Sequence, residues 1–464
     1  MWSLFFAAAV CPAQIAPPSA PPEKLEAGKL IERVVTAANP EQSYALYLPS
    51  NYSPDRSWPV VFAFDPGAQG KIPVDQMKDA AERYGYIVLG SNNSRNGPWK
   101  PESEAADAML QDAQKRFAVD LKRIYFAGFS GGARVASQLA QLCKCAAGVL
   151  LSGAGFSQHS QPLRETSFPV FSAVGLLDFN YSEVIPLQDK LEKAGYPHWL
   201  CAFNGQHQWA PPEVMDEALA WFRIQAMRNN REPPDEAFVT AKLKEMVSIA
   251  EKQDASGVSL SAWRLYKQIA SAYEGVADVA RFKVKAEELA RTKAVQDALK
   301  RERNDFADQE SLSSQILGTL QTKENIERPR SEGGANATQQ VHELRLRSET
   351  EKETDKAIVL KRALAGVFVG AIEAGNDVLD KKDYRNASRY FSIAAEGRPD
   401  AEWPLRQLAI AQALDKDRKA SMETLKRVKA KANNAEEFMH WLQTEPAFQE
   451  LRTHAEFGEL GIKN

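Results

Sequence analysis

The chain has 464 residues, of which 44% are hydrophobic and 26% are charged, and its formal net charge is −3. This composition is typical of a soluble globular protein. The lack of a basic excess argues against a general nucleic-acid-binding protein. At about 100–200 residues per domain, the length predicts two or three domains.

The segment 1–13 is an apolar run followed by small residues, which is typical of a secretory signal peptide cleaved after Ala13. It is too short to span a bilayer, which takes about 20 apolar residues. We therefore expect an exported protein, periplasmic or secreted. Because no Lys or Arg precedes the run, a mis-assigned start or a disordered tail is the alternative. Val10 disfavours lipidation of Cys11, and residues 14–28, rich in Pro and Ala, are predicted to be a flexible leader.

Residues 29–229 alternate between strand-like and helix-like patterns. Several strand-like runs, such as Val60–Phe64, are apolar throughout, as in parallel strands covered by helices on both faces. This alternation predicts an α/β fold with a doubly wound, mostly parallel sheet. The first two runs have a short connection and are predicted to form an antiparallel edge. The runs are Ile31–Ala37, Tyr44–Leu48, Pro59–Phe64, Tyr86–Ser91, Arg123–Gly128, Ala146–Ser152, Pro169–Gly175 and His198–Phe203.

The second half of the chain is predicted to be all α-helical, after a linker at Asn229–Asp235. It divides into helical domains at 236–326 and 339–464, separated by a Pro- and Gly-containing segment. Within 368–400 the spacing of small and aromatic residues is that of one tetratricopeptide repeat, and plain helical hairpins are the alternative. Such repeats would offer a surface for a protein partner. The residues that define the spacing are Gly375, Tyr384, Ala387, Phe391, Ala394 and Pro399.

Three cysteines would remain after removal of the signal peptide: Cys143, Cys145 and Cys201. An odd number at these spacings does not form a disulfide framework, so we expect free thiols. No second cysteine pair or histidine cluster completes a zinc site. No metal and no organic cofactor are predicted.

Ser130 lies in Gly128–Gly132, which fits the G-x-S-x-G nucleophile elbow between a strand and a helix. Glycines there remove side chains that would clash in so tight a turn. The turn would lift the hydroxyl out of the sheet to the helix N-terminus, where the N–H of Gly131 can bind an oxyanion. The alternative is an ordinary turn with a capping serine.

The nucleophile needs a base and an orienting acid, and His207 with Asp178 fits the chain order serine, acid, histidine. His207 follows the last predicted strand, whereas His159 precedes every suitable acid and His198 begins a strand. Asp178 follows the strand before. The competing acids, Glu183 and Asp189, fall on or near the next helix.

A second oxyanion donor is expected in the loop Phe64–Gly70, where Pro66 has no N–H and Gly67, or else Ala68, must serve. Asn92 and Asn93, which follow the next strand, and Trp209 are predicted to contact substrate. A solvated loop is the alternative for the asparagines.

The elbow, the Asp178 loop and the segment Gly205–Pro212 resemble those of secreted bacterial esterases of the feruloyl esterase and polyhydroxybutyrate depolymerase type, and of the wider phospholipase/carboxylesterase group. The resemblance covers about residues 30–228. It implies an α/β-hydrolase fold, a Ser130–His207–Asp178 triad and hydrolysis of acyl esters through an acyl-enzyme. A prolyl-oligopeptidase-like peptidase shares this fold and triad order. A catalytically silent hydrolase fold that acts as a binding module with the helical repeats is a further alternative.

Overall fold

The computed structural model describes residues 25–157, 161–318, 333–352 and 354–461. The predicted signal peptide, the leader up to residue 24 and His159 lie outside the described residues. Within the described ranges, no helix is long and apolar enough to cross a membrane.

The predicted sheet forms with eight strands in the order β1-β2-β4-β3-β5-β6-β7-β8. β1 and β2 form the antiparallel edge expected from their short connection, and β2 also pairs antiparallel with β4. All later neighbours are parallel. The predicted α/β fold with a mostly parallel sheet is therefore confirmed. The strands are Leu30–Val35, Ser43–Tyr47, Trp58–Phe64, Ile87–Ser91, Val119–Phe129, Ala146–Ser152, Val170–Gly175 and His198–Phe203.

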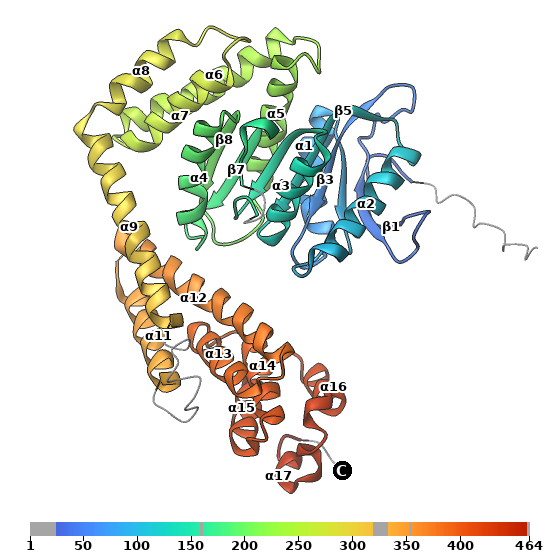
Figure 1. The fold of residues 1–464 in the computed structure, drawn as a ribbon, viewed down its shortest axis with the longest axis vertical. Coiled ribbons are helices and arrows are strands. Elements are labelled where there is room, and N and C mark those ends of the chain that lie inside the picture. The colour runs from blue at the N-terminus through green and yellow to red at the C-terminus, as the bar shows by residue number, and fades with distance from the viewer. Residues whose placement is uncertain (1–24, 158–160, 319–332, 353, 462–464) are drawn as a thin grey trace, which may run out of the picture.

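The apolar strands are buried because helices cover both faces of the sheet (Figure 1). Successive side chains of a strand point to opposite faces. Val61 and Ala63 accordingly pack with the helices α1 (Lys71–Tyr84) and α5 (Pro212–Arg228). Phe62 and Phe64 belong to the opposite core, with α2 (Trp99–Arg116), α3 (Gly131–Cys143) and α4 (Tyr181–Ala194).

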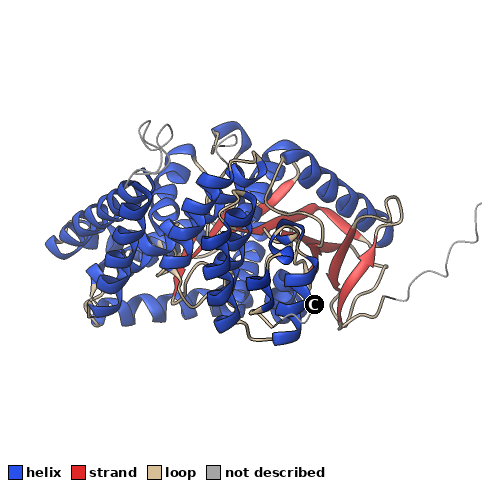
Figure 2. Ribbon diagram, turned by 90° about the horizontal axis from the view of Figure 1, so that it is seen from below, coloured by secondary structure: helices blue, strands red, loops and turns tan. Residues whose placement is uncertain are grey.

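The second half of the described chain is helical throughout, as predicted. Helices α6, α7 and α8 bury Met246, Tyr266 and Phe282 in the same core as α1 and α5. The long helix α9 leads from them to the C-terminal helices, which lie below the α/β domain in Figure 1 and in front of it in the view from below (Figure 2). We call α9 and α11–α17 the helical arm. The helices are α6 Glu236–Ala255, α7 Ser259–Ala272, α8 Ala280–Ala290, α9 Lys293–Gly318, α11 Gly333–Thr350, α12 Asp355–Asp380, α13 Tyr384–Gly397, α14 Glu402–Leu414, α15 Arg418–Lys431, α16 Ala435–Thr444 and α17 Ala455–Gly458.

Gly375 on α12 lies against Phe391 on α13, where an added Cβ would come within 2.8 Å of the ring. This close approach is the role that the spacing of small residues predicts. The assignment of these helices to a tetratricopeptide repeat, and the domain boundaries, stay predictions.

The prediction that all three cysteines are free is wrong, because Cys143 and Cys145 form a disulfide. Helix α3 ends at Cys143, and Lys144 takes a left-handed conformation with φ 52°. This turns the chain back, so that the two Cα atoms lie 5.1 Å apart, within disulfide range. Cys201 is free, and burial raises the pKa of its thiol well above the ordinary value.

The helical arm is anchored to the loop that follows β7. Arg362 on α12 is buried, donates from Nε to the carbonyl of Leu176 at 2.7 Å, and stacks its guanidinium 3.6 Å from the ring centroid of Tyr181. On α9, Gln309 donates from Nε2 to the carbonyl of Phe179 at 2.7 Å. Two helices of the arm therefore hold the loop 176–181 from outside the sheet.

We predict that Arg362→Met destabilises this loop by about 2 kcal/mol, because the carbonyl of Leu176 loses a buried, charged donor. Hydrogen–deuterium exchange over residues 176–182 should become faster. Arg385→Met, which removes an exposed ion pair with Asp415, is the matched control and should change exchange there very little. Equal protection of the loop in the wild type and in Arg362→Met would contradict the anchoring role.

Candidate active site

Ser130 sits at the tip of a strained turn between β5 and α3. Its backbone has φ 53° and ψ −120°, a conformation that a residue with a side chain rarely adopts. A Cβ on Gly128 would lie 2.0 Å from the carbonyl oxygen of Gly132, and a Cβ on Gly132 would lie 2.0 Å from that of Phe64. The turn can therefore close only with glycine at these two positions.

The structure brings Ser130, His207 and Asp178 together at the carboxyl ends of three parallel strands. Ser130 Oγ lies 3.0 Å from His207 Nε2, and His207 Nδ1 lies 2.9 Å and 3.0 Å from the two carboxylate oxygens of Asp178. Asp178 is fully buried, and its Oδ1 also accepts the N–H of Asn180 at 2.8 Å. This is the geometry that a serine nucleophile, a histidine base and an orienting acid would require.

Backbone contacts hold the acid and histidine loops against each other. Leu177 N donates to the carbonyl of Gly205 at 2.8 Å, and Leu176 N donates to that of Phe203 at 2.8 Å. Gly175 lets the loops meet, since a Cβ there would lie 2.4 Å from the carbonyl oxygen of Gln206.

The imidazole of His207 packs between two phenylalanine rings. The centroids of Phe129 and Phe179 lie 4.6 Å and 4.4 Å from the centroid of the imidazole. They restrict its tilt, while Asp178 fixes its rotation. Neither ring was predicted from the sequence to contribute to the site, although Phe129 directly precedes Ser130 and Phe179 directly follows Asp178.

The residues that were set aside as base or acid of the triad lie elsewhere. His198 Nδ1 lies 2.9 Å from the carbonyl oxygen of Tyr196, and burial lowers the pKa of its imidazole. Glu183 forms a bidentate ion pair with Arg134, with both N–O distances at 2.9 Å. Asp189 lies on α4, as expected.

Gly67 does not fit the predicted oxyanion role, because its N–H donates to Asp65 Oδ1 at 2.8 Å. The neighbouring amide of Ala68 donates to the carbonyl of Asp65 at 3.1 Å. Asp65 thus closes the turn with its own carboxylate, and both amides are already engaged.

The three predicted substrate contacts also have structural partners instead. Trp209 is 5% exposed and donates from Nε1 to Asp65 Oδ2 at 2.8 Å. Asn92 donates to the carbonyl of Glu32 at 3.1 Å, and Asn93 binds the N–H of Ser43 at 2.8 Å. The two asparagines therefore hold the antiparallel edge of the sheet.

The same loop nevertheless supplies a residue to the site, Asn96. Its backbone N–H donates to the carbonyl of Pro66 at 2.9 Å. Its carboxamide covers Gly131 so closely that a Cβ there would lie 1.8 Å from Oδ1 and 3.1 Å from Nδ2. The side chain therefore lies directly against Gly131, and both residues line a cavity with Ser130. The polar composition of this loop pointed to a role at the site, but the sequence does not show which of its asparagines bind the sheet and which reach Gly131.

Two cavities flank Ser130 and His207, and Phe179 lines both. The first, of about 570 Å³, is polar, and we call it the Ser130-side cavity. Its lining includes Asn96, Glu102, Ser130, Gly131, Arg134 and Glu373. The second, of about 330 Å³, is the His207-side cavity, which α12 closes with apolar side chains and one lysine.

Glu102 is 8% exposed and faces the Ser130-side cavity. Burial raises the pKa of its carboxyl to about 7. Among the described residues, no group of three or more His, Cys, Asp and Glu side chains is placed to hold a metal ion.

We predict that Glu102 makes the protein less stable as the pH rises. Its pKa in the folded state, about 7, lies above the ordinary value of 4.5, so its protonated form is favoured by folding below pH 4.5 and this advantage is lost between about pH 4.5 and 7. Urea midpoints of the wild type should fall relative to Glu102→Gln between pH 5 and pH 8. Glu104→Gln, at an exposed position of the same helix, should follow the wild type. Parallel curves for wild type and Glu102→Gln would show that burial does not perturb this carboxyl.

No protein-family model matches the chain, and no curated protein matches it. Among solved structures, an esterase from Pyrobaculum calidifontis is 13% identical, with 43% of this chain and 85% of that one covered and a TM-score of 0.34. A ferulic acid esterase is 15% identical, with 42% and 96% covered and a TM-score of 0.36. An acylaminoacyl peptidase from Pyrococcus horikoshii is 12% identical, with 40% and 39% covered and a TM-score of 0.32.

Proposed function

We propose that this chain is a serine hydrolase that cleaves carboxylic esters through an acyl-enzyme. The observation that carries the proposal is the continuous hydrogen-bond chain from Ser130 Oγ through His207 to the buried carboxylate of Asp178, at a strained elbow beside two cavities. A capping serine would need neither a histidine at 3.0 Å nor a buried acid behind that histidine.

In the first step, Ser130 Oγ attacks the ester carbonyl while His207 Nε2 takes the hydroxyl proton. Asp178 keeps the other ring nitrogen protonated and stabilises the imidazolium that forms. The tetrahedral intermediate then collapses: the C–O bond to the alcohol breaks, and His207 gives its proton to the departing oxygen. A water molecule, deprotonated by His207, attacks the acyl-enzyme, and Ser130 recovers its proton as the carboxylic acid leaves.

Two donors are available for the oxyanion in this proposal. The first-turn N–H of Gly131 has no acceptor within its helix, since helices leave their first amides unbonded. The side-chain amide of Asn96, which covers Gly131, replaces the Gly67 amide that Asp65 has taken. Side-chain amides are established oxyanion donors in other serine hydrolases.

The decisive test is the variant Ser130→Ala. A fluorophosphonate probe should label the wild type and leave the variant unlabelled, and ester hydrolysis should fall about 10⁴-fold or more. Ser103→Ala, at an exposed position on α2, is the control and should keep labelling and turnover. A folded wild type that the probe does not label would overturn the hydrolase proposal in favour of a binding module.

Ester and amide substrates with the same acyl group separate the esterase from the peptidase alternative. We expect turnover of the ester, with kcat/KM for the amide lower by about 10³-fold or more, corresponding to about 4 kcal/mol of the barrier. Comparable values for an oligopeptide amide would favour the peptidase.

Asn96→Ala should lower kcat by about 10²–10³-fold with little change in KM, because the lost donor acts on the transition state. Asn92→Ala is the matched control from the same loop, since its amide binds Glu32 rather than the site. It should lower stability more than kcat. An unchanged kcat in Asn96→Ala would remove this residue from the oxyanion site.

A further inference from the structure

The His207-side cavity combines apolar walls with two cationic side chains. The walls come from both parts of the chain, with Leu177 and Phe179 beside the acid and Leu364 and Phe368 on α12. The cations are Lys361 on α12 and Arg398, which follows α13. The lining contains no Asp or Glu. The two cations would therefore attract an anion that entered this cavity, and no carboxylate in the lining would repel it.

Neither cation is neutralised within the part of the chain that the structure describes, because none of its ion pairs involves Lys361 or Arg398. Arg134, which lines the Ser130-side cavity, is by contrast paired with Glu183 through two contacts. Arg398 instead lies with its guanidinium 4.8 Å from the ring centroid of Phe368, which also lines the cavity. The ring supports the side chain and leaves its N–H donors available to a ligand.

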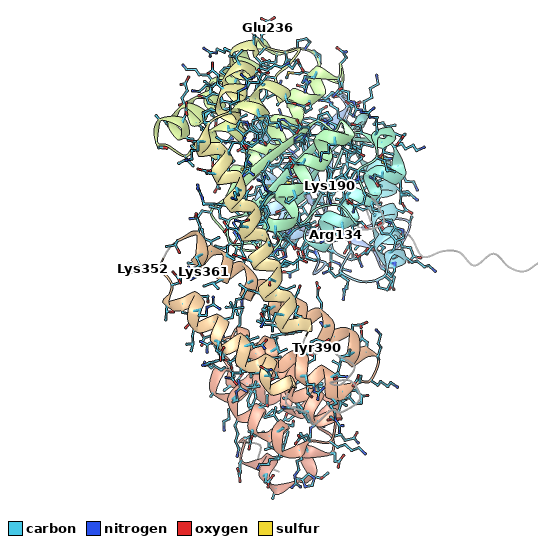
Figure 3. The ribbon with its side chains drawn as sticks, turned by 60° about the vertical axis from the view of Figure 1, so that its left-hand side comes forward. Arg134, Lys190, Glu236, Lys352, Lys361 and Tyr390 are labelled. Atoms are coloured by element: carbon cyan, nitrogen blue, oxygen red, sulfur yellow. A yellow bond between two sulfur atoms is a disulfide. The ribbon has the colours of Figure 1, made fainter. Side chains whose placement is uncertain are left out.

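Lys361 is held in place by its neighbour in sequence. Arg362 is bonded to Leu176 and stacked on Tyr181, so the adjoining turn of α12 cannot move away from the histidine loop without breaking these contacts. Figure 3 labels Lys361 on the helical arm and Arg134 on the α/β domain above it. The backbone of Lys361 is therefore held next to the loop 176–181.

The proposed mechanism decides which part of the substrate enters this cavity. His207 gives its proton to the departing alcohol, so the alcohol leaves on the histidine side. Gly131 and Asn96, the oxyanion donors, line the other cavity, which then receives the acyl group. The two cavities thus separate the alcohol part from the acyl part of one ester.

We propose that the substrates are esters whose alcohol part is apolar and ends in an anionic group, carboxylate or phosphate, held by Lys361 and Arg398. This inference rests on the proposed function. It deepens that function by naming the class of leaving group, and it makes the helical arm half of the substrate site.

The test compares acetyl esters of one phenol that carries either a propanoate or a propanamide side chain. The two esters match in size and in leaving-group reactivity and differ in charge. Wild type should show kcat/KM about tenfold higher for the propanoate ester, and 0.5 M NaCl should shrink this ratio because exposed charges are screened. The double variant Lys361→Gln/Arg398→Gln should bring the ratio of the two kcat/KM values to about one.

Lys356→Gln is the control, since Lys356 lies on the same helix, is exposed and does not line the cavity. It should keep the wild-type ratio. A third ester with a propylphosphonate side chain distinguishes the sources of charge: a higher kcat/KM than for the propanoate identifies a phosphate-type group, and a lower one identifies a carboxylate. A ratio of one in the wild type, or a ratio that survives in the double variant, would overturn the inference.

A binding measurement separates failure of this inference from failure of the proposed function. In Ser130→Ala, calorimetry should show the phenol propanoate binding about tenfold more tightly than the propanamide, whether or not the wild type turns over. If the fluorophosphonate labels Ser130 but neither assay shows a charge preference, only the leaving-group assignment fails. If the probe does not label the wild type, the proposed function fails, and the calorimetric comparison alone decides whether Lys361 and Arg398 hold an anionic group.

Discussion

The backbone strain at Ser130 is the constraint on which the rest of the site depends. A residue other than glycine keeps a backbone φ of 53° only where surrounding contacts enforce it. Here the carbonyl of Phe64 packs closely against Gly132, and the carbonyl of Gly132 packs closely against Gly128. β5, which carries the elbow, lies between β3 and β6 in the middle of the sheet. The packing of the sheet therefore offsets the conformational free energy that the strained turn costs. Its parallel strands also bring β7 and β8 to the same edge, where Asp178 and His207 complete the hydrogen-bond chain.

The fold could be predicted from the sequence because its signals are local. Apolar runs mark strands buried on both faces, and glycines around a serine mark a turn that only glycine allows. The positions of His207 and Asp178 followed from chain order, since each comes directly after a strand of a parallel sheet. In each case one short segment carried the information.

Predictions that depended on the partner of a polar group were less successful. The N–H of Gly67 was predicted from the sequence to be available as a donor, yet it donates to the carboxylate of Asp65, two residues earlier. Asn92 and Asn93 are polar loop residues, but the antiparallel edge uses their amides. The cysteine pair depended on a left-handed Lys144, a conformation for which the sequence gives no strong signal. Lys361 and Arg398 lie some 150 residues or more beyond His207 in the chain, so only the tertiary packing reveals that they line a cavity with it.

Helix α12 has two roles. Arg362 binds the loop 176–181, and neighbouring side chains of the same helix line the His207-side cavity. Anchoring and recognition thus use different side chains of one rigid element. Under the proposed substrate assignment, substitutions at Lys361, Leu364 or Phe368 would change which alcohol is accepted without altering the sheet, the elbow or the contacts of Arg362. A lineage carrying this architecture would then diversify its choice of alcohol through changes on a single helix face, while the proposed chemistry at Ser130 stayed the same.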